Sequence, residues 1–183
     1  MVVTDARERL KEILKERSIL RGRFKLASGR ESDYYIDARL TTLDAEGVNL
    51  IAGLFLAEIE RDPEIAAVGG PTMGADPIVG ALISLSHEAG SPLNGFLVRK
   101  EEKGHGTWKL IEGHLKEGDR VTIVEDVATT GGSIIRALNA VRDRGAVAKK
   151  VCVVVDREAG AGERIESEGA EFYSIFKVAE LLG

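Results

Sequence analysis

The segment VTIVEDVATTGGS, residues 121–133, limits the folds open to this chain more than any other part of its sequence. It opens with a β-branched apolar run of the kind that fills a buried parallel strand. Glu125 and Asp126 follow where that strand is expected to end, and a helical pattern begins at Ile134. Open α/β sheets bind their ligands at the carboxyl ends of their strands. The segment therefore predicts a strand, a ligand-binding loop and a helix, in that order.

Mostly small and hydroxyl-bearing residues fill the loop between the acids and the helix. They are Val127, Ala128, Thr129, Thr130, Gly131, Gly132 and Ser133. Such a loop lets backbone N–H groups converge on an anion at a helix N-terminus, which predicts a phosphate site. A simple tight turn is the alternative. The adjacent carboxylates would repel a phosphate alone, so they favour a ligand that also carries sugar hydroxyls or a developing cation, such as a ribose phosphate.

Strand and helix patterns alternate along most of the chain, which predicts an α/β fold with a doubly wound, mainly parallel sheet and helices on both faces. Strands are expected at 66–68, 94–98, 121–124, 151–155 and 172–176, and helices from Asp5, from about Thr41, from about Pro77 to His87 and from Ile134 to about Gly145. We expect Asp5 to cap the first helix and that helix to pack at an edge of the molecule. The polar stretch 99–119 is expected to form a long exposed loop.

Composition narrows the class of protein. A chain of 183 residues suits one domain, and no apolar run approaches the roughly 20 residues that span a membrane. Its charged N-terminus lacks the pattern of a secretory signal, so we expect a cytoplasmic protein with no membrane partner. The single cysteine, Cys152, lies in an apolar run and is expected to be a buried small hydrophobe. A net charge of −5 disfavours a nucleic-acid partner.

Four segments, in this order, carry a family resemblance: FKLASGRESDYYID (24–37), RKEEKGHG (99–106), the EDVATTGGS loop and DREAG (156–160). Together the chain resembles the orotate phosphoribosyltransferases, which have the type I phosphoribosyltransferase fold. The resemblance implies transfer of the 5-phosphoribosyl group of phosphoribosyl pyrophosphate (PRPP) to orotate, giving orotidine 5′-monophosphate and pyrophosphate in pyrimidine biosynthesis. It implies a single domain over residues 1–183, with a hood or arm at 1–40, a PRPP-binding core at 41–183 and a mobile loop at about 100–113.

The same resemblance implies roles for the loop after the central strand. Residues 125–133 would hold the ribose 5-phosphate of PRPP, with Glu125 and Asp126 facing the ribose hydroxyls. Asp126 would be catalytic, because breaking the bond at the anomeric carbon develops positive charge that a carboxylate stabilises more in the transition state than in the ground state. A solvated strand end is the alternative for the two acids. Mg²⁺ would be held by PRPP itself, with no ligands expected from the protein.

Cations for the leaving pyrophosphate would come from Arg99, Lys100, Lys103 and His105. Lys103 and His105 are expected to be catalytic, in a loop that reaches the neighbouring subunit of a homodimer. His105 would either protonate the departing oxygen or donate a hydrogen bond to it, and the sequence leaves both roles open. Because Glu101 and Glu102 share the loop, plain solvation is the alternative.

Orotate is planar and anionic, and Arg157 suits its carboxylate because guanidinium groups bind carboxylates bidentately. A surface ion pair with Asp156 or Glu158 is the alternative for this arginine. By resemblance, Thr129 also approaches the base, and Ser28 and Tyr35 belong to a hood over it.

The chain departs from some family members at two positions, since it lacks a lysine at Ala27 and another in the loop after Pro71. Two other functions stay open from the sequence. A phosphoribosyltransferase for a purine base would share the phosphate loop but have no use for an arginine that binds a carboxylate. A PRPP-sensing regulator would have little need of a cationic loop over the pyrophosphate.

Overall fold

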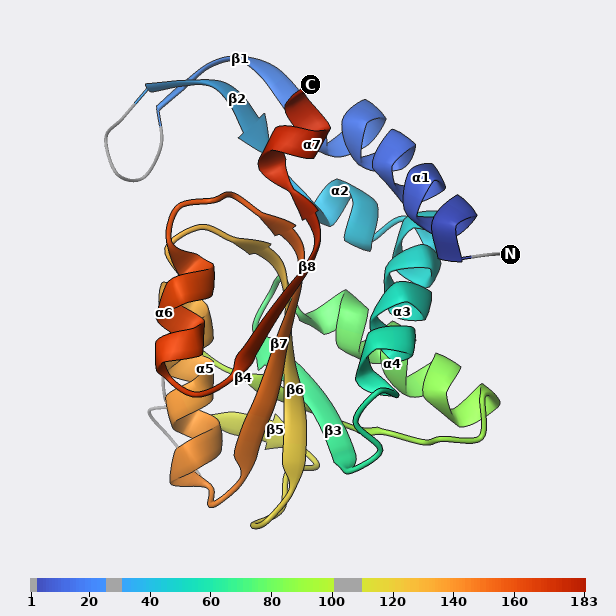
Figure 1. Cartoon of the computed structure of the whole chain (residues 1–183), viewed down its shortest axis with the longest axis vertical. Coiled ribbons are helices and arrows are strands. Elements are labelled where there is room, and N and C mark those ends of the chain that lie inside the picture. Colours follow the sequence, from blue (N-terminus) through green and yellow to red (C-terminus); the bar gives the residue numbers. More distant parts are fainter. Residues whose placement is uncertain (1–2, 26–30, 101–109) are drawn as a thin grey trace.

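The computed structural model describes residues 3–25, 31–100 and 110–183. A six-stranded sheet stands between two helical layers, and a two-stranded arm extends over one end of it (Figure 1). The helices are α1 (Val3–Ile13), the π-helical turn η1 (Leu14–Ser18), α2 (Arg39–Thr42), α3 (Ala45–Ile59), α4 (Asp76–Glu88), α5 (Gly132–Asp143), α6 (Ala161–Ser167) and α7 (Val178–Leu182). The strands are β1 (Ile19–Lys25), β2 (Glu31–Ile36), β3 (Ile65–Pro71), β4 (Asn94–Val98), β5 (Ile111–Gly113), β6 (Arg120–Ala128), β7 (Val147–Asp156) and β8 (Glu171–Lys177).

The strand order in the main sheet is β5-β4-β3-β6-β7-β8. Only β5 runs antiparallel to its neighbour, and the other pairs are parallel. Helices α3 and α4 cover one face, with α1 packed against α3, and α5 and α6 cover the other (Figure 1). The prediction of a doubly wound, mainly parallel α/β sheet is confirmed.

Alternation along the central strand divides the core between these two layers. Val124 packs into the cluster on the side of α1, α3 and α4, whereas Val121 and Ile123 pack into the cluster on the side of α5 and α6. All three side chains are fully buried. Cys152, the register partner of Val124, is also fully buried in the first cluster, as expected for a small hydrophobe.

The central strand is longer than its apolar run indicated. Strand β6 continues to Ala128, which pairs with Asp156 of β7, so Glu125 and Asp126 lie within the strand rather than after it. The strand can continue because ladder hydrogen bonds use only the backbone, and side chains at its carboxyl end reach the open edge of the sheet. The acids are therefore held by a strand that pairs with β3 on one side and β7 on the other.

Two predictions about the N-terminal helices were wrong. Helix α1 starts at Val3, so Asp5 lies in its first turn instead of capping it, although the predicted apolar stripe is buried, with Leu10 and Ile13 fully covered. The helix expected from Thr41 is two helices, α2 and α3, separated at Asp44. Asp44 has an extended backbone and caps α3, since its Oδ1 accepts a hydrogen bond from the Gly47 N–H at 2.9 Å.

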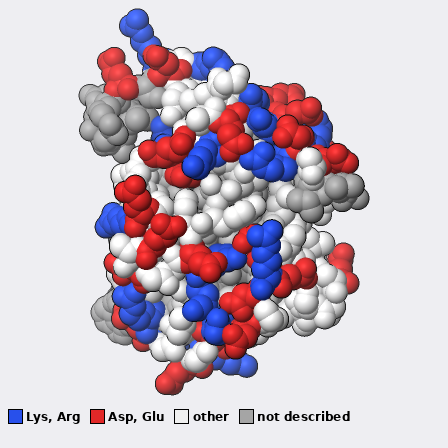
Figure 2. Space-filling view, in the orientation of Figure 1, with Lys and Arg blue, Asp and Glu red and all other residues white. Residues whose placement is uncertain are grey.

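The polar stretch 99–119 is also not one loop, because residues 111–113 form β5 at the edge of the sheet beside β4. Ile111 of β5 is buried in the core, which the many charged residues of this stretch did not indicate. None of the helices in the described ranges is both apolar and long enough to cross a membrane. On the face shown in Figure 2, acidic and basic side chains of the described residues are interspersed.

Candidate active site

A cavity of about 660 Å³ opens at the carboxyl edge of the sheet and is lined on one side by β2 of the arm. Its wall is assembled from the ends of four strands and from the segment that joins the arm to α2. The strand ends contribute Pro71–Gly74 after β3, Val98–Lys100 after β4, Glu125–Val127, Thr129, Ser133 and Arg136 from β6 and α5, and Arg157 after β7. The arm contributes Tyr35–Arg39. Residues as far apart in the chain as Tyr35 and Arg157 thus meet around one space.

The two acids of β6 form a buried pair at the cavity wall. Glu125 is only 5% exposed, and its Oε2 accepts a hydrogen bond from Ser133 Oγ at 3.3 Å. Asp126 is half-buried, and its Oδ1 accepts from the Val127 N–H at 2.7 Å. Burial, reinforced by the neighbouring Asp126, raises the pKa of Glu125 to about 9, and burial also raises the pKa of Asp126. The pair suits a ligand that brings positive charge or hydroxyl groups.

The loop after β3 presses its backbone against this pair. A Cβ atom at Gly74 would lie 2.2 Å from Glu125 Oε1 and 2.6 Å from Asp126 Oδ1, so a side chain at this position would have to displace the acids or the loop. The peptide bond between Thr72 and Met73 in the same loop is cis. From the sequence we expected a glycine-rich corner at this loop, but contact with the acids joins residues far apart in the chain and was missed.

The predicted phosphate loop occupies the N-terminus of α5. Gly131 has a left-handed backbone, with φ of 74°, and precedes the first helical residue. Thr129 and Thr130 are exposed, and the Thr130 carbonyl accepts a hydrogen bond from Arg164 Nη1 at 3.2 Å. The first N–H groups of a helix have no partner within it, so the start of α5 can receive an anion. Thr129 and Ser133 also line the cavity, which brings the cradle and the acids together.

Basic side chains from several elements reach the same cavity. Arg99 and Lys100 follow β4, and Arg99 Nη1 lies 3.7 Å from Glu112 Oε1. Lys103 and His105 lie outside the described residues, so their predicted part in the site rests on the sequence alone.

Arg39 and Arg136 also line the cavity, and the sequence reasoning missed both. Arg39 Nε donates to Asp37 Oδ1 at 2.8 Å and its Nη2 donates to Oδ2 at 2.9 Å, and this pairing lowers the pKa of Asp37. Arg136 follows the predicted phosphate loop by one helical turn. The Asp-x-Arg spacing after the arm was the only signal for Arg39.

Arg157 lies at the cavity wall, and its guanidinium carbon is 5.5 Å from the centroid of the Tyr34 ring. Its N–H donates to the Ala128 carbonyl at 2.9 Å, which joins the loop after β7 to the end of β6. The two neighbouring acids hold backbone groups instead of the guanidinium. Asp156 Oδ1 accepts from the Glu158 N–H at 2.9 Å, and Glu158 Oε2 accepts from the Ala179 N–H at 3.3 Å. The arginine is therefore directed to the cavity.

The chain is similar in sequence and in fold to known phosphoribosyltransferases. A family model described as a phosphoribosyl transferase domain matches residues 42–178. The orotate phosphoribosyltransferase of Aquifex aeolicus is 45% identical over 179 residues, covering 96% of this chain and 97% of the relative. That of Mycobacterium tuberculosis H37Rv is 43% identical over 175 residues, covering 96% of each chain. A crystal structure of the latter enzyme in complex with PRPP superposes with a TM-score of 0.80 at 40% identity, covering 96% of this chain and 98% of that one.

Proposed function

The chain belongs to the phosphoribosyl transferase domain family, and we propose that it transfers the 5-phosphoribosyl group of PRPP to orotate. The products are orotidine 5′-monophosphate and pyrophosphate, and the reaction serves pyrimidine biosynthesis. The observation that carries this proposal is one cavity that unites an acid pair, a helix N-terminus and Arg157, in a chain similar over nearly its full length to orotate phosphoribosyltransferases.

PRPP binds with its 5-phosphate at the start of α5 and its ribose toward the acids. The backbone N–H groups of residues 129–133 surround the phosphate, and the hydroxyls of Thr129, Thr130 and Ser133 are available to donate to it. The ribose hydroxyls pair with Glu125 and Asp126. A phosphate bound at the start of α5 places the ribose beside Glu125 and Asp126, because the phosphate loop and the two acids belong to one continuous segment from β6 to α5.

Asp126 stabilises the ribosyl cation that develops as the pyrophosphate leaves. Burial disfavours its ionised form in the free protein, so positive charge developing on the ribose stabilises this carboxylate. The interaction grows as the bond to pyrophosphate breaks, which makes it stronger in the transition state than in the ground state. Glu125, with its pKa near 9, stays protonated at neutral pH and donates a hydrogen bond to a ribose oxygen.

Orotate occupies the part of the cavity between Arg157 and the arm. The guanidinium binds the orotate carboxylate, while the Tyr34 ring supports the guanidinium from behind. Thr129 and Tyr35, both in the cavity wall, are placed to contact the base. This arrangement favours orotate over a purine, since an oxopurine has no carboxylate for the arginine.

The pyrophosphate lies toward Arg99 and Lys100, with Lys103 and His105 completing its cationic surroundings. Arg39 adds a cation from the arm side, which compensates for the lysines that this chain lacks at Ala27 and after Pro71. Asp37 holds Arg39 in that position through the paired hydrogen bonds.

Mg²⁺ is the metal that the reaction requires, and the cavity fits an ion that arrives with PRPP. No group of three or more metal-ligating side chains occurs among residues 3–25, 31–100 and 110–183. Asp126 is the carboxyl group of the pair that would gain from the positive charge of an ion arriving with PRPP, because burial disfavours its ionised form. Mg²⁺ would neutralise charge on the leaving pyrophosphate.

The enzyme works as a cytoplasmic homodimer of single-domain subunits, in which residues 1–40 form the hood and 41–183 the PRPP-binding core. What supports the dimer is the loop with Lys103 and His105, which by family resemblance serves the neighbouring subunit.

Turnover of a panel of bases tests the proposal. The protein is mixed with PRPP and Mg²⁺ and then with orotate, uracil, adenine or hypoxanthine, and the ultraviolet absorbance of each base is followed. Orotate alone should be consumed rapidly, and uracil, which lacks the carboxylate, should react far more slowly. Turnover of a purine without turnover of orotate would overturn the proposal.

A further inference from the structure

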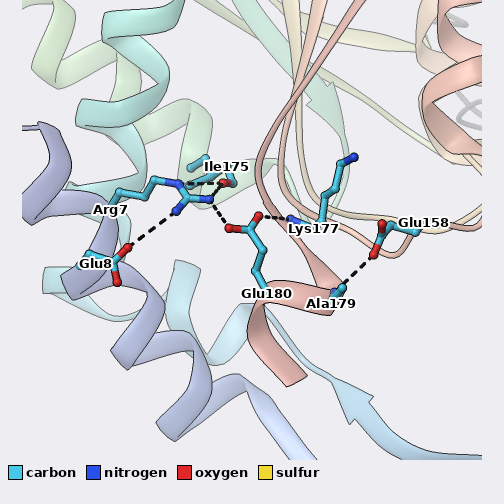
Figure 3. Close-up of polar contacts among 7 residues, drawn as sticks. All are labelled: Arg7, Glu8, Glu158, Ile175, Lys177, Ala179 and Glu180. Carbon is cyan, nitrogen blue, oxygen red and sulfur yellow. Dashed lines mark hydrogen bonds and ion pairs between the residues drawn. The ribbon is translucent and has the colours of Figure 1, made fainter. Parts of the chain in front are cut away.

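We propose that the short helix α7 positions Arg157 for orotate through the carboxylate of Glu158. Glu158, Glu180 and Arg7 are then positioning residues for the base site, although none of them lines the cavity. The inference rests on the proposed function, because it assigns these contacts to the recognition of orotate. Figure 3 shows the contacts in one view.

The loop after β7 sends two adjacent side chains in different directions. Arg157 lines the cavity, whereas Glu158 reaches the backbone of α7 (Figure 3). Glu158 makes this possible by adopting a left-handed backbone, with φ of 54°, which is rare for a residue with a side chain. Asp156 Oδ1 supports this conformation by accepting the Glu158 N–H at 2.9 Å. The direction of Arg157 therefore depends on a backbone conformation that other contacts must maintain.

The side chain of Glu158 stabilises its left-handed backbone conformation through a hydrogen bond to α7. Its Oε2 accepts the N–H of Ala179, the second residue of the helix, at 3.3 Å. A carboxylate is favoured at the N-terminus of a helix, where the first N–H groups lack partners within the helix. Glu158 thus connects the backbone that directly follows Arg157 to helix α7.

Helix α7 is in turn fixed to α1 and to the end of β8. Glu180 Oε1 accepts the Lys177 N–H at 3.0 Å, and its Oε2 lies 2.6 Å from Arg7 Nη2. Arg7 also donates to the Ile175 carbonyl, through Nε at 3.2 Å and Nη2 at 3.0 Å (Figure 3). These bonds lower the pKa of Glu180, so it stays ionised at neutral pH. The Arg7 guanidinium lies 4.5 Å from the Phe176 ring centroid, and the cluster connects the N-terminal helix to the C-terminal one.

Among the described residues, two other contacts hold Arg157, and neither fixes the backbone that follows it. Its N–H is bonded to Ala128, and its guanidinium lies over Tyr34 of the arm. Without the Glu158 carboxylate, the residue after Arg157 can relax from its left-handed backbone, and the guanidinium then turns relative to the cavity. The 5-phosphate cradle and the acid pair lie on β6 and α5 and keep their geometry. The expected consequence is poorer binding of orotate with unchanged binding of PRPP.

Three substitutions of Glu158 distinguish the effect of its side-chain acceptor from the effect of its left-handed backbone. Glu158→Ala removes the acceptor, Glu158→Gln keeps an oxygen that can accept the Ala179 N–H, and Glu158→Gly removes the acceptor while easing the left-handed backbone. We expect the orotate KM to rise about fivefold to tenfold in the alanine and glycine variants and less than twofold in the glutamine variant, the scale of one lost hydrogen bond. The PRPP KM should stay within twofold in all three.

Matched variants complete the test. Glu163→Ala removes an exposed acid from nearby α6 and should change neither KM. Glu180→Ala should raise the orotate KM in the same direction as Glu158→Ala, because it releases α7 from Arg7. Thermal unfolding of each variant shows whether it is folded at the assay temperature.

The outcomes distinguish this inference from the proposed function. If the wild-type protein does not use orotate, the proposed function fails and this inference fails with it. If the wild-type protein uses orotate but Glu158→Ala leaves the orotate KM unchanged, or raises both KM values equally, only the positioning role is overturned. A rise in the glutamine variant equal to that in the alanine variant would also overturn it.

Discussion

Gly74 lies so close to Glu125 that a Cβ atom at residue 74 would stand 2.2 Å from Oε1 of the carboxyl group. The loop after β3 therefore serves as a wall that sets the position of both acids on β6. Real Cβ atoms do not approach an oxygen so closely, so any side chain at residue 74 must displace either the loop or the acids.

Gly74→Ala should accordingly lower kcat/KM for PRPP by at least about tenfold, the effect of a small misplacement of reacting groups. Gly80→Ala is the matched control, because a Cβ at this exposed glycine of α4 has no atom within 4 Å. The control should keep full activity. Steady-state kinetics with PRPP varied compares the two, and equal activity in both variants would show that the acids do not depend on this wall.

Gly131→Val should weaken PRPP binding by changing the backbone of the phosphate cradle. A Cβ at residue 131 would lie 3.5 Å from Ala161, an ordinary contact, so the effect comes from the left-handed backbone, with φ of 74°, and not from a clash. Forcing a side chain into that conformation costs about 1–2 kcal/mol per residue. Gly90→Val carries the same backbone cost away from the cavity, at φ of 81°.

Calorimetric titration with PRPP measures the difference between these two variants. We expect a Kd at least about fivefold higher for Gly131→Val, equivalent to about 1 kcal/mol, and an unchanged Kd for Gly90→Val. Should both proteins bind PRPP as the wild type does, the anion is held elsewhere.

The stability of the free protein should fall as pH rises from about 5 to about 9, because of Glu125. Burial raises its pKa from 4.5 to about 9, so the folded protein holds a proton that the unfolded chain releases across this range. The unfolded state then binds fewer protons, and the free energy of unfolding decreases with pH. The same sign applies to Asp126, whose pKa burial also raises.

Urea unfolding between pH 5.5 and pH 9 tests this dependence. Glu125→Gln, which is neutral at every pH, should flatten the curve and should be more stable than the wild type near pH 9. A wild-type stability that increases over the same range would mean that Glu125 is ionised in the folded protein.

Arg157→Ala should raise the orotate KM far more than the PRPP KM, since the base and the sugar occupy different parts of the cavity. A charged hydrogen bond is worth about 1.5–3 kcal/mol, which corresponds to roughly tenfold to a hundredfold in KM. Arg164→Ala provides a control on nearby α6, where the guanidinium bonds to the Thr130 carbonyl. That variant should affect PRPP rather than orotate, and the opposite pattern in the two variants would refute the assignment of Arg157.

Local sequence pattern predicted the parts of this protein that depend on neighbours in the chain. The β-branched run at 121–124 and the glycines that follow it identified the central strand, the turn into the next helix and α5, because each has a short-range signature. The place of Arg157 was also predicted, since a residue directly after a parallel strand must lie at the ligand-binding edge.

Contacts between distant segments could not be predicted in the same way. The approach of Gly74 to Glu125 and the anchoring of Glu158 by α7 depend on how elements pack, which no local pattern records. Strand β5 was missed because it is only three residues long and its buried residue, Ile111, lies in a stretch rich in charged residues and glycine. Arg39 lines the cavity while paired with Asp37, and neither its place nor that pairing has a local signature strong enough to predict it.

The rate of orotidine 5′-monophosphate formation by Asp126→Asn at saturating PRPP and orotate tests most directly whether this cavity is the active site. The substitution keeps the shape of the side chain but removes the charge, so we expect turnover to fall about a hundredfold to a thousandfold, the scale of one lost transition-state contact, with an unchanged fold by circular dichroism. Asp143→Asn, an exposed change at the end of α5, should leave the rate unaltered. A near-normal rate in Asp126→Asn would contradict the account.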